Sequence, residues 1–207
     1  MSMGYTNGEA ANDTRRVFDA IFRALASESR RAILRQLSDR SPREIQDILP
    51  PDEGAQSHDT AIHFHHVHLP CLREASLVRD RGDRIGRTGH PIWNSASFHE
   101  LLGRTETSHP DAFGAFTHPL CRATGYVLTQ RGSRMTRAEL ARELPEVLPE
   151  HADDPFLAVR LHHVHLPMLD AAGVIDYDAN EALVSYNDNP LVPLVVDVLR
   201  DIGSNGS

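Results

Sequence analysis

The sequence contains an internal repeat, and this feature constrains the possible folds more strongly than any other. Residues 60–78 and 157–175 are identical at nine of 19 positions, and six of these nine form the block HHVHLP. Weaker matches extend upstream at an offset of 95 residues, which becomes 97 at the histidine block. A unit of about 75–80 residues is long enough to be a small domain. The sequence therefore predicts a duplicated domain.

Helical patterns dominate the first copy up to residue 76. Apolar residues recur at helical spacing over 17–25 and again over 32–37, where Ser27 is a suitable N-cap. A short third helix is expected over 42–49, because Ser41 can cap it and Glu44 can close a capping box.

A longer fourth helix is expected to begin at Asp59 or Thr60. Its predicted inward positions follow helical spacing, and Pro70 should kink or divide it because proline lacks a backbone donor. The predicted inward residues are Ile62, His65, Leu69 and Leu72.

A β-hairpin follows the fourth helix in both copies. In the first copy, residues 77–78 and 85–93 are strand-like and a turn is expected around Gly82. In the second copy, the corresponding strands are expected at 174–177 and 182–186. This pattern is that of a winged helix-turn-helix, in which the hairpin is the wing.

Three segments of the first copy resemble the ArsR-like winged helix-turn-helix transcription regulators: RALASESRRAIL (23–34), SPREIQDIL (41–49) and HLPCLREASLV (68–78). The segment HLPMLDAAGVI (165–175) of the second copy is similar to the same family, and HHVHLP is similar to a block in uncharacterised haloarchaeal winged-helix domains. The resemblance implies a dimeric, sequence-specific DNA-binding transcription regulator. Since residues 42–49 hold no cysteine pair, the thiolate sensor of the metal-sensing members is not expected.

The expected fold class is mainly α with small β wings, comprising two tandem winged helix-turn-helix domains and a C-terminal helix. The first domain is expected at 14–93, a linker at 94–110, the second domain at 111–187 and the C-terminal helix at 190–202. Residues 1–13 are polar and small, and we expect them to be disordered.

Charge is divided unevenly between the two copies. All 21 basic residues are arginine, and residues 1–104 carry 14 of them against 14 Asp and Glu, whereas residues 105–207 carry seven against 15. The first half is therefore neutral, and the second has the whole net charge of −8. Because carboxylates repel phosphate, we expect the first copy to bind double-stranded DNA and the acidic second copy to brace it, dimerise or receive a protein partner.

Residues of two kinds are expected to contact DNA: outward side chains of the fourth helix, which reach base edges, and cations near phosphate. The wing carries four arginines against two aspartates. The expected DNA-binding residues are Arg43, Thr60, His63, His66, Val67, Arg79, Arg81, Arg84 and Arg87.

Nine of the 13 histidines lie in or beside the two fourth-helix segments. Helical spacing makes His65, His68 and Cys71 candidate ligands for zinc. However, Cys71 is replaced by Met168 in the second copy, so packing explains the shared block better than metal. A structural role, a metal site and a pH-responsive role remain open, in that order.

The C-terminal segment 190–202 is strongly apolar but too short to cross a bilayer. It must be buried in its own chain or in a partner, and the family resemblance favours a dimer interface. The residues expected in that interface are Leu191, Leu194, Val195, Val198, Leu199 and Ile202.

Sequence-specific transcription regulation is therefore the leading hypothesis for function. The alternative is a winged-helix interaction or scaffold module without specific DNA binding. A metal-dependent enzyme ranks third, because the sequence shows no acid–base pair, nucleophile set or phosphate loop. No cofactor, enzymatic activity or membrane association is expected, and two cysteines with no apolar leader favour the cytoplasm.

Overall fold

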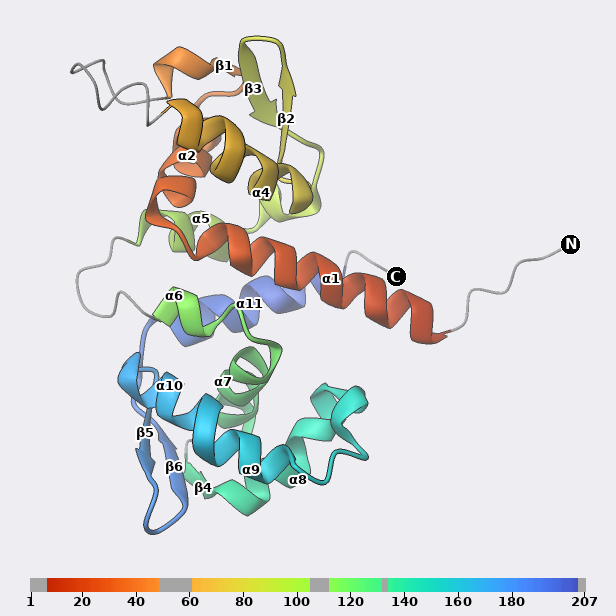
Figure 1. Cartoon of the computed structure of the whole chain (residues 1–207), viewed down its shortest axis with the longest axis vertical. Helices are drawn as coiled ribbons and strands as arrows, with labels where there is room; N and C mark the ends of the chain where they lie inside the picture. Colours follow the sequence, from red (N-terminus) through yellow and green to blue (C-terminus); the bar gives the residue numbers. More distant parts are fainter. Residues whose placement is uncertain (1–6, 49–60, 105–111, 132–133, 205–207) are drawn as a thin grey trace, which may run out of the picture. The chain divides into compact units, whose positions relative to one another are not determined.

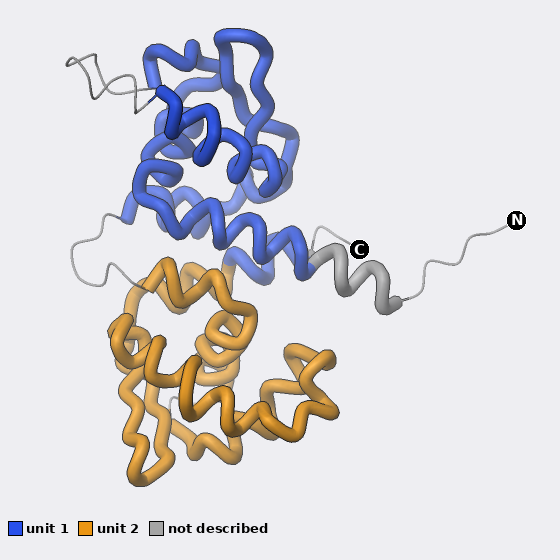
Figure 2. Tube along the Cα trace, in the orientation of Figure 1, with its two compact units in different colours: residues 1–105, 198–207 blue, residues 106–197 orange. Residues whose placement is uncertain are grey.

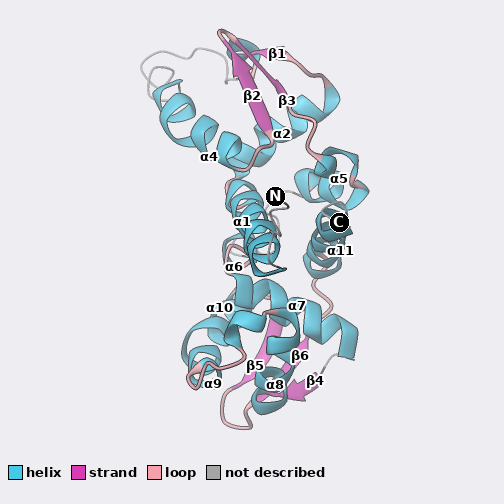
Figure 3. Cartoon of the chain, turned by 90° about the vertical axis from the view of Figure 1, so that its right-hand side faces the viewer, coloured by secondary structure: helices cyan, strands magenta, loops and turns pink. Residues whose placement is uncertain are grey.

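The structure is a computed structural model that describes residues 7–48, 61–104, 112–131 and 134–204. The chain divides into two compact units, residues 1–105 with 198–207 (unit 1) and residues 106–197 (unit 2; Figure 2). Each unit is mainly helical and has one small antiparallel sheet (Figures 1 and 3). The coarse fold class expected from the sequence, mainly α with small β elements, is confirmed.

Unit 1 begins with two helices that pack against each other, α1 (Asn7–Leu25) and α2 (Glu28–Asp39). As expected, Ser27 caps α2, and its side chain accepts a hydrogen bond from the backbone N–H of Arg30. The helix spanning residues 61–74 follows in the described chain and includes the π-helical segment η2 (Phe64–His68) and α4 (Leu69–Glu74). The buried side chains of Ile21, Leu25, Leu34, Leu37, Phe64 and Leu72 form the core of these helices.

The sheet of unit 1 has the order β1-β3-β2 and consists of β1 (Arg43–Glu44), β2 (Val78–Arg81) and β3 (Arg84–Arg87). Its inner face carries the buried side chains of Val78 and Ile85. After the hairpin, η3 (Pro91–Asn94) and α5 (Ala96–Gly103) complete the unit. The indole of Trp93 is buried and donates a hydrogen bond to the Leu77 carbonyl, which fixes this return of the chain at the base of the hairpin.

Unit 2 has the same succession of elements. Its helices and turns are α6 (Ala112–Ala115), α7 (Pro119–Arg131), α8 (Arg137–Val147), η4 (Pro149–His151), α9 (Leu157–Arg160), the π-helical η5 (Leu161–His165) and α10 (Leu166–Ala171). Its sheet has the order β4-β6-β5 and consists of β4 (Arg134–Thr136), β5 (Ile175–Asp178) and β6 (Leu183–Tyr186). Both strands of the second hairpin lie within one residue of their predicted bounds.

The structural repeat has a smaller offset upstream than the sequence comparison suggested. Arg31 in α2 donates from Nη1 to the Leu25 carbonyl, and Arg122 in α7 donates from Nη1 to the Phe116 carbonyl, six residues earlier in both cases. Both arginines are buried, at 1% and 4% exposure. These helices therefore correspond at an offset of 91, and the expected offset of 95 is wrong for this part of the chain. Because the offset is 97 at the histidine block, the segment between these helices and that block is six residues longer in unit 2 than in unit 1.

The expected helix over 42–49 starts later than predicted. Residues 43–44 remain extended and pair with β3, and only the short 3₁₀ turn η1 (Ile45–Asp47) follows. Ser41 does not cap this turn, because its hydroxyl accepts the Arg87 N–H at 2.8 Å. The predicted capping box is present instead in unit 2, where Thr136 and Glu139 bond reciprocally at the start of α8.

The inward face of the fourth helix also differs from the prediction. His65 and Ile62 are exposed, and Phe64 is buried instead at 1% exposure. In the π-helical segment the Leu69 N–H bonds to the Phe64 carbonyl, five residues earlier, so the spacing of buried positions is five rather than four. This extra residue lies directly before Pro70, which removes a donor from the regular ladder. Unit 2 repeats the arrangement, with Leu161 and Leu166 buried.

The N-terminal segment is more helical than expected, and part of the expected linker belongs to unit 1. The helix α1 begins at Asn7, inside the segment expected to be disordered. The expected linker contains α5, which belongs to unit 1: Arg35 donates to the Leu102 carbonyl at 2.9 Å, and Phe98 is fully buried. The boundary between the units falls at residue 105.

Helix α11 (Leu191–Ser204) is the expected C-terminal helix, and it extends two residues further than predicted. Its residues up to Asp197 belong to unit 2, and those from Val198 belong to unit 1. Within unit 2 it approaches α7 closely, because a Cβ on Gly125 would lie 3.2 Å from Val192 Cγ1. No helix among the described residues is long and apolar enough to cross a membrane.

Candidate nucleic-acid interface

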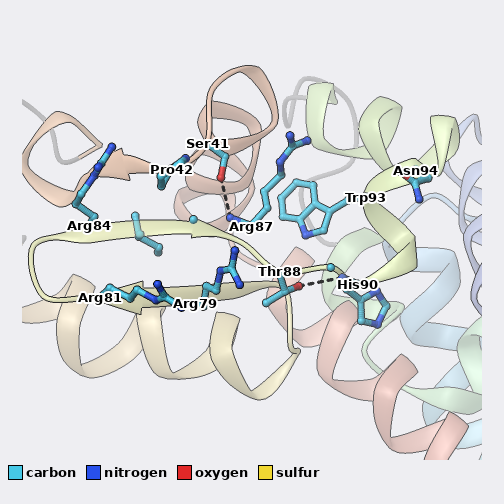
Figure 4. Close-up of a pocket in the computed structure, with 13 residues that line it drawn as sticks. Ser41, Pro42, Arg79, Arg81, Arg84, Arg87, Thr88, His90, Trp93 and Asn94 are labelled. Carbon is cyan, nitrogen blue, oxygen red and sulfur yellow. Dashed lines mark hydrogen bonds between the residues drawn. The ribbon is translucent and has the colours of Figure 1, made fainter.

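The outer face of the unit 1 sheet carries a cleft of about 570 Å³ that is lined by arginines (Figure 4). Because side chains alternate along a strand, burying Val78 places Arg79 and Arg81 on the opposite, outer face. Arg84 is paired with Arg81 across the hairpin and shares that face. We call this the arginine cleft; its lining residues are Ser41, Pro42, Arg79, Arg81, Arg84, Ile85, Gly86, Arg87, Thr88, Gly89, His90, Trp93 and Asn94.

The arginine cleft has no carboxylate among its lining residues. Asp80 lies on the inner face and pairs with Arg73 at 3.4 Å, so its charge is directed away from the cleft. Within the described ranges, Arg79, Arg81 and Arg84 form no ion pair, and all three are exposed. Several guanidinium groups without a counter-charge are suited to binding an anion such as phosphate.

One wall of the cleft is built by the chain before β1. Pro42 lies over β3 so closely that a Cβ on Gly86 would come 3.1 Å from Pro42 Cβ. At the other end, the Arg87 guanidinium lies 5.5 Å from the centre of the Trp93 ring. Sequence reasoning found the arginines but missed Ser41, Pro42 and Trp93 as walls. The only tryptophan, six residues after the last wing arginine, was the available signal.

Arg43 does not line the arginine cleft. Its side chain is half-buried and donates to the Gln36 side chain at 3.1 Å and to the Asp47 carbonyl at 3.4 Å. The structure thus uses this guanidinium to join α2, β1 and η1. Its predicted contact with phosphate stays a prediction.

The first part of the helix spanning residues 61–74 presents the other predicted contacts. His63, His66 and Val67 are all exposed, Val67 at 41%. Thr60 lies outside the described residues. The π-helical segment therefore leaves a polar and apolar surface open on the same unit as the arginine cleft.

His68 is the histidine of this block that turns inward, rather than His65. Its Nε2 lies 3.3 Å from His63 Nδ1, while its own Nδ1 is buried without a hydrogen-bond partner. Burial lowers the pKa of His68, and the nearby charges of Arg30 and His63 lower it further. This histidine is therefore neutral at pH 7.

The candidate metal ligands are not brought together. Across the described parts of the chain, no group of three or more His, Cys, Asp or Glu is placed to hold a metal ion. His65 is exposed, whereas His68 is half-buried and directed toward His63.

The equivalent inward histidine of unit 2 is His165. Its Nδ1 lies 3.6 Å from the buried Cys121 Sγ. Burial, followed by the charges of His118, Arg160 and His151, lowers the pKa of His165 to about 4. Burial also raises the pKa of Cys121 to about 12, so this pair consists of a neutral imidazole and a protonated thiol at pH 7.

The outer face of the unit 2 sheet has the opposite charge. Asp176 and Asp178 occupy the positions that Arg79 and Arg81 have in unit 1, since both pairs alternate with a buried first residue of the strand. A shallow hollow of about 500 Å³ lies on this face, and we call it the acidic face. Its lining residues are Arg134, Asp170, Asp176, Tyr177, Asp178, Ala179, Asn180, Leu183 and Ser185.

The residues expected at a dimer interface in α11 are largely covered within the chain. Val195 and Val198 are 1% and 0% exposed, and Leu191, Leu194 and Ile202 are at most 9% exposed. Only Leu199 is half-buried. Dimerisation through these residues stays a prediction.

Comparison with known proteins adds one match. The model of a family described as "Domain of unknown function (DUF7344)" matches residues 113–185, which cover most of unit 2 from α6 to β6. No curated protein and no solved structure matches the chain.

Proposed function

We propose that the chain is a cytoplasmic, sequence-specific DNA-binding regulator of transcription, and that unit 1 is the part that binds DNA. The observation that carries this proposal is the arginine cleft, whose lining includes four arginines and no carboxylate. Three of these arginines, Arg79, Arg81 and Arg84, lie on the outer face of the β-hairpin. Such a set of cations releases counterions when it meets a polyanion, and this is the main source of affinity for DNA.

The arrangement of elements around the cleft supports a winged helix-turn-helix. A strand, a short helical turn, a longer helix and a hairpin follow one another, and the first strand pairs with the last in the order β1-β3-β2. This agrees with the resemblance of the sequence to ArsR-like regulators. In this proposal the helix spanning residues 61–74 enters the major groove and the hairpin follows the phosphate backbone.

Side-chain chemistry assigns roles to the exposed residues of that helix. The imidazoles of His63 and His66 can donate to base edges or phosphates, and Val67 can contact a thymine methyl group. Arg79, Arg81 and Arg84 hold phosphates, which sets the register without reading sequence. As a homodimer, the protein would bind a near-palindromic site through two copies of this helix.

The test is selection of duplexes from a random library by the full-length protein, followed by a gel shift with the selected duplex in excess random DNA. We expect specific retention in this competition. Retention that random DNA removes completely would overturn the proposal of sequence-specific binding.

The second candidate is a protein-interaction module, which the surface of unit 2 favours. Besides the acidic face, unit 2 exposes three apolar side chains at the N-cap of α9 and along α9 and η5: Phe156, Val159 and Val164, at 66%, 51% and 46%. Absence of any specific duplex in the selection would favour this candidate over the regulator.

A further inference from the structure

We propose that the acidic face of unit 2 docks into the arginine cleft of a second copy of this chain and thereby competes with DNA for the cleft. This inference rests on the proposed function, since it names a regulator of the same site. The partner is another copy, because the chain itself carries both a surface without carboxylates and a surface of similar build with clustered carboxylates.

The spacing of the charges on the two faces is the same. Arg79 and Arg81 are two residues apart on β2, and Asp176 and Asp178 are two residues apart on β5. In both strands these positions lie on one face, about 7 Å apart. Two guanidinium groups can therefore meet two carboxylates at once, and Arg–carboxylate pairs of this kind form bidentate hydrogen bonds.

Both sets of charges are available for pairing. Within the described part of the chain, neither Asp176 nor Asp178 forms an ion pair, and both are exposed. Oδ1 of Asp178 accepts the N–H groups of Asn180 and Glu181, which holds the carboxylate outward and leaves its second oxygen open. Arg134 is the one cation among the lining residues of the acidic face, against three aspartates.

The charge of the two halves brings the faces together in one orientation. Residues 1–104 are neutral overall, and residues 105–207 carry −8. Two copies of unit 2 therefore repel each other, whereas unit 2 of one chain is attracted to the arginine cleft of another. Complementary fields of this kind accelerate association and determine its register.

The first experiment measures self-association of the full-length chain by sedimentation velocity without DNA. We expect the mean mass to rise with protein concentration at about 50 mM NaCl, and the association to weaken by at least about tenfold at about 500 mM NaCl, because salt screens exposed charges. A mass that stays monomeric at every concentration overturns the inference. This result would also be obtained if the two faces bound each other within one chain.

Two variants then separate the faces. D176N/D178N removes the acidic charge and keeps a side-chain oxygen at position 178 to accept the hydrogen bonds of the turn, and R79A/R81A/R84A removes the cleft charge. We expect each variant alone to lose self-association and a mixture of the two to form a complex of two chains, because one supplies the cleft and the other supplies the acidic face. The matched control E150Q/D153N removes the same number of exposed negative charges from unit 2 outside the acidic face and should still associate.

DNA binding by the same variants distinguishes this inference from the proposed function. D176N/D178N should bind the selected duplex at least as tightly as the wild type, while R79A/R81A/R84A should lose binding. If D176N/D178N still self-associates like the wild type, the inference is wrong and the proposed function is unaffected. If neither protein binds a duplex but self-association follows the two faces, the inference holds and the proposed function fails.

Discussion

The outer faces of the two sheets have the same strand order and a similar register, yet their charges are opposite. At corresponding places on the first strand of the hairpin, unit 1 has arginine and unit 2 has aspartate. On the second strand, Arg84 corresponds to Leu183 and Gly86 to Ser185. The exposed residues of these strands therefore differ between the units. The turn also differs, because it is two residues longer in unit 2, where Asp178 pairs with Leu183, than in unit 1, where Arg81 pairs with Arg84.

On the inner faces of the two sheets, by contrast, the buried residues are similar in both units. Ile85 and Val184 are both fully buried at the centre of their sheets, and Leu72 and Leu169 are both fully buried in the helix before the hairpin. Burial constrains a side chain by volume and polarity, whereas an exposed side chain on a strand contributes little to stability. The two units therefore agree in the buried residues on which the fold depends and differ in the exposed residues, which the fold does not constrain.

The largest effect is expected when the exposed strand residues of unit 2 replace those of unit 1. In R79D/R81D/R84L the cleft loses three cations and gains two carboxylates, so we expect the affinity for the selected duplex to fall by about 10³-fold. Fluorescence anisotropy at several salt concentrations measures this, and the slope of log K against log salt should fall by about three. The control R142D changes an exposed arginine of α8, and a full loss of binding in that control would contradict the assignment.

Both units contain a buried arginine at equivalent positions, and its replacement should reduce the free energy of unfolding equally in both. Replacing Arg31 or Arg122 by methionine removes the guanidinium that satisfies the carbonyl at the end of the preceding helix. We expect each change to reduce the free energy of unfolding by about 2 kcal/mol, because a buried acceptor loses a charged donor. Urea unfolding measures both, and R142M is the exposed control. A large loss in one unit and none in the other would show that the two arginines are not equivalent.

Substitution at the helix start that follows the first strand should reduce the free energy of unfolding in unit 2 but not in unit 1. T136A removes the N-cap of α8 and should cost about 1 kcal/mol of unfolding free energy, whereas T136S should retain it. In unit 1, Glu44 occupies the position before η1 and forms no capping bond, so E44A should leave stability unchanged. Thermal unfolding compares the three variants. Equal losses from E44A and T136A would contradict the structural difference.

The smallest effect is expected from pH at the inward histidine of unit 2. The pKa of His165 is about 4 in the folded chain against an ordinary 6.5, so the unfolded chain binds more protons between these values. Stability should therefore fall as the pH drops from about 6.5 to about 4, by a small amount because the side chain is only half-buried. Denaturant midpoints across this range should show a flatter decline for H165N than for the wild type. The exposed neighbour provides the control H163N, whose decline should match that of the wild type.

Several parts of the structure follow directly from sequence patterns. Ser27 caps α2 as its position before the apolar stripe predicts, and the strands of the second hairpin lie within one residue of their predicted bounds. The wing arginines were identified because four of them cluster within nine residues. These features depend on neighbours in the chain, so local chemistry is sufficient to predict them.

Other parts depend on contacts that local patterns do not contain. Ser41 has the sequence of a helix cap, but its hydroxyl accepts from Arg87, 46 residues away, and the helical turn starts later. His65 has the spacing of an inward residue, but the π-helical segment before Pro70 shifts the register to Phe64. The walls of the arginine cleft, Pro42 and Trp93, likewise come from segments far apart in the sequence.

Sequence patterns alone predict a duplicated domain and mostly helical elements, and they place the excess of arginine over acidic residues in the wing of the first copy. Composition and periodicity carry this information residue by residue. Which side chains lie together is visible only in the folded chain. Four arginines line one cleft, aspartates lie on the corresponding face of the other unit, and His68 rather than His65 is directed inward. Strand pairing determines which face of a sheet each side chain occupies, and one extra residue in a helical turn changes the direction of the side chains that follow. Both strand pairing and the extra residue depend on contacts between segments far apart in the sequence.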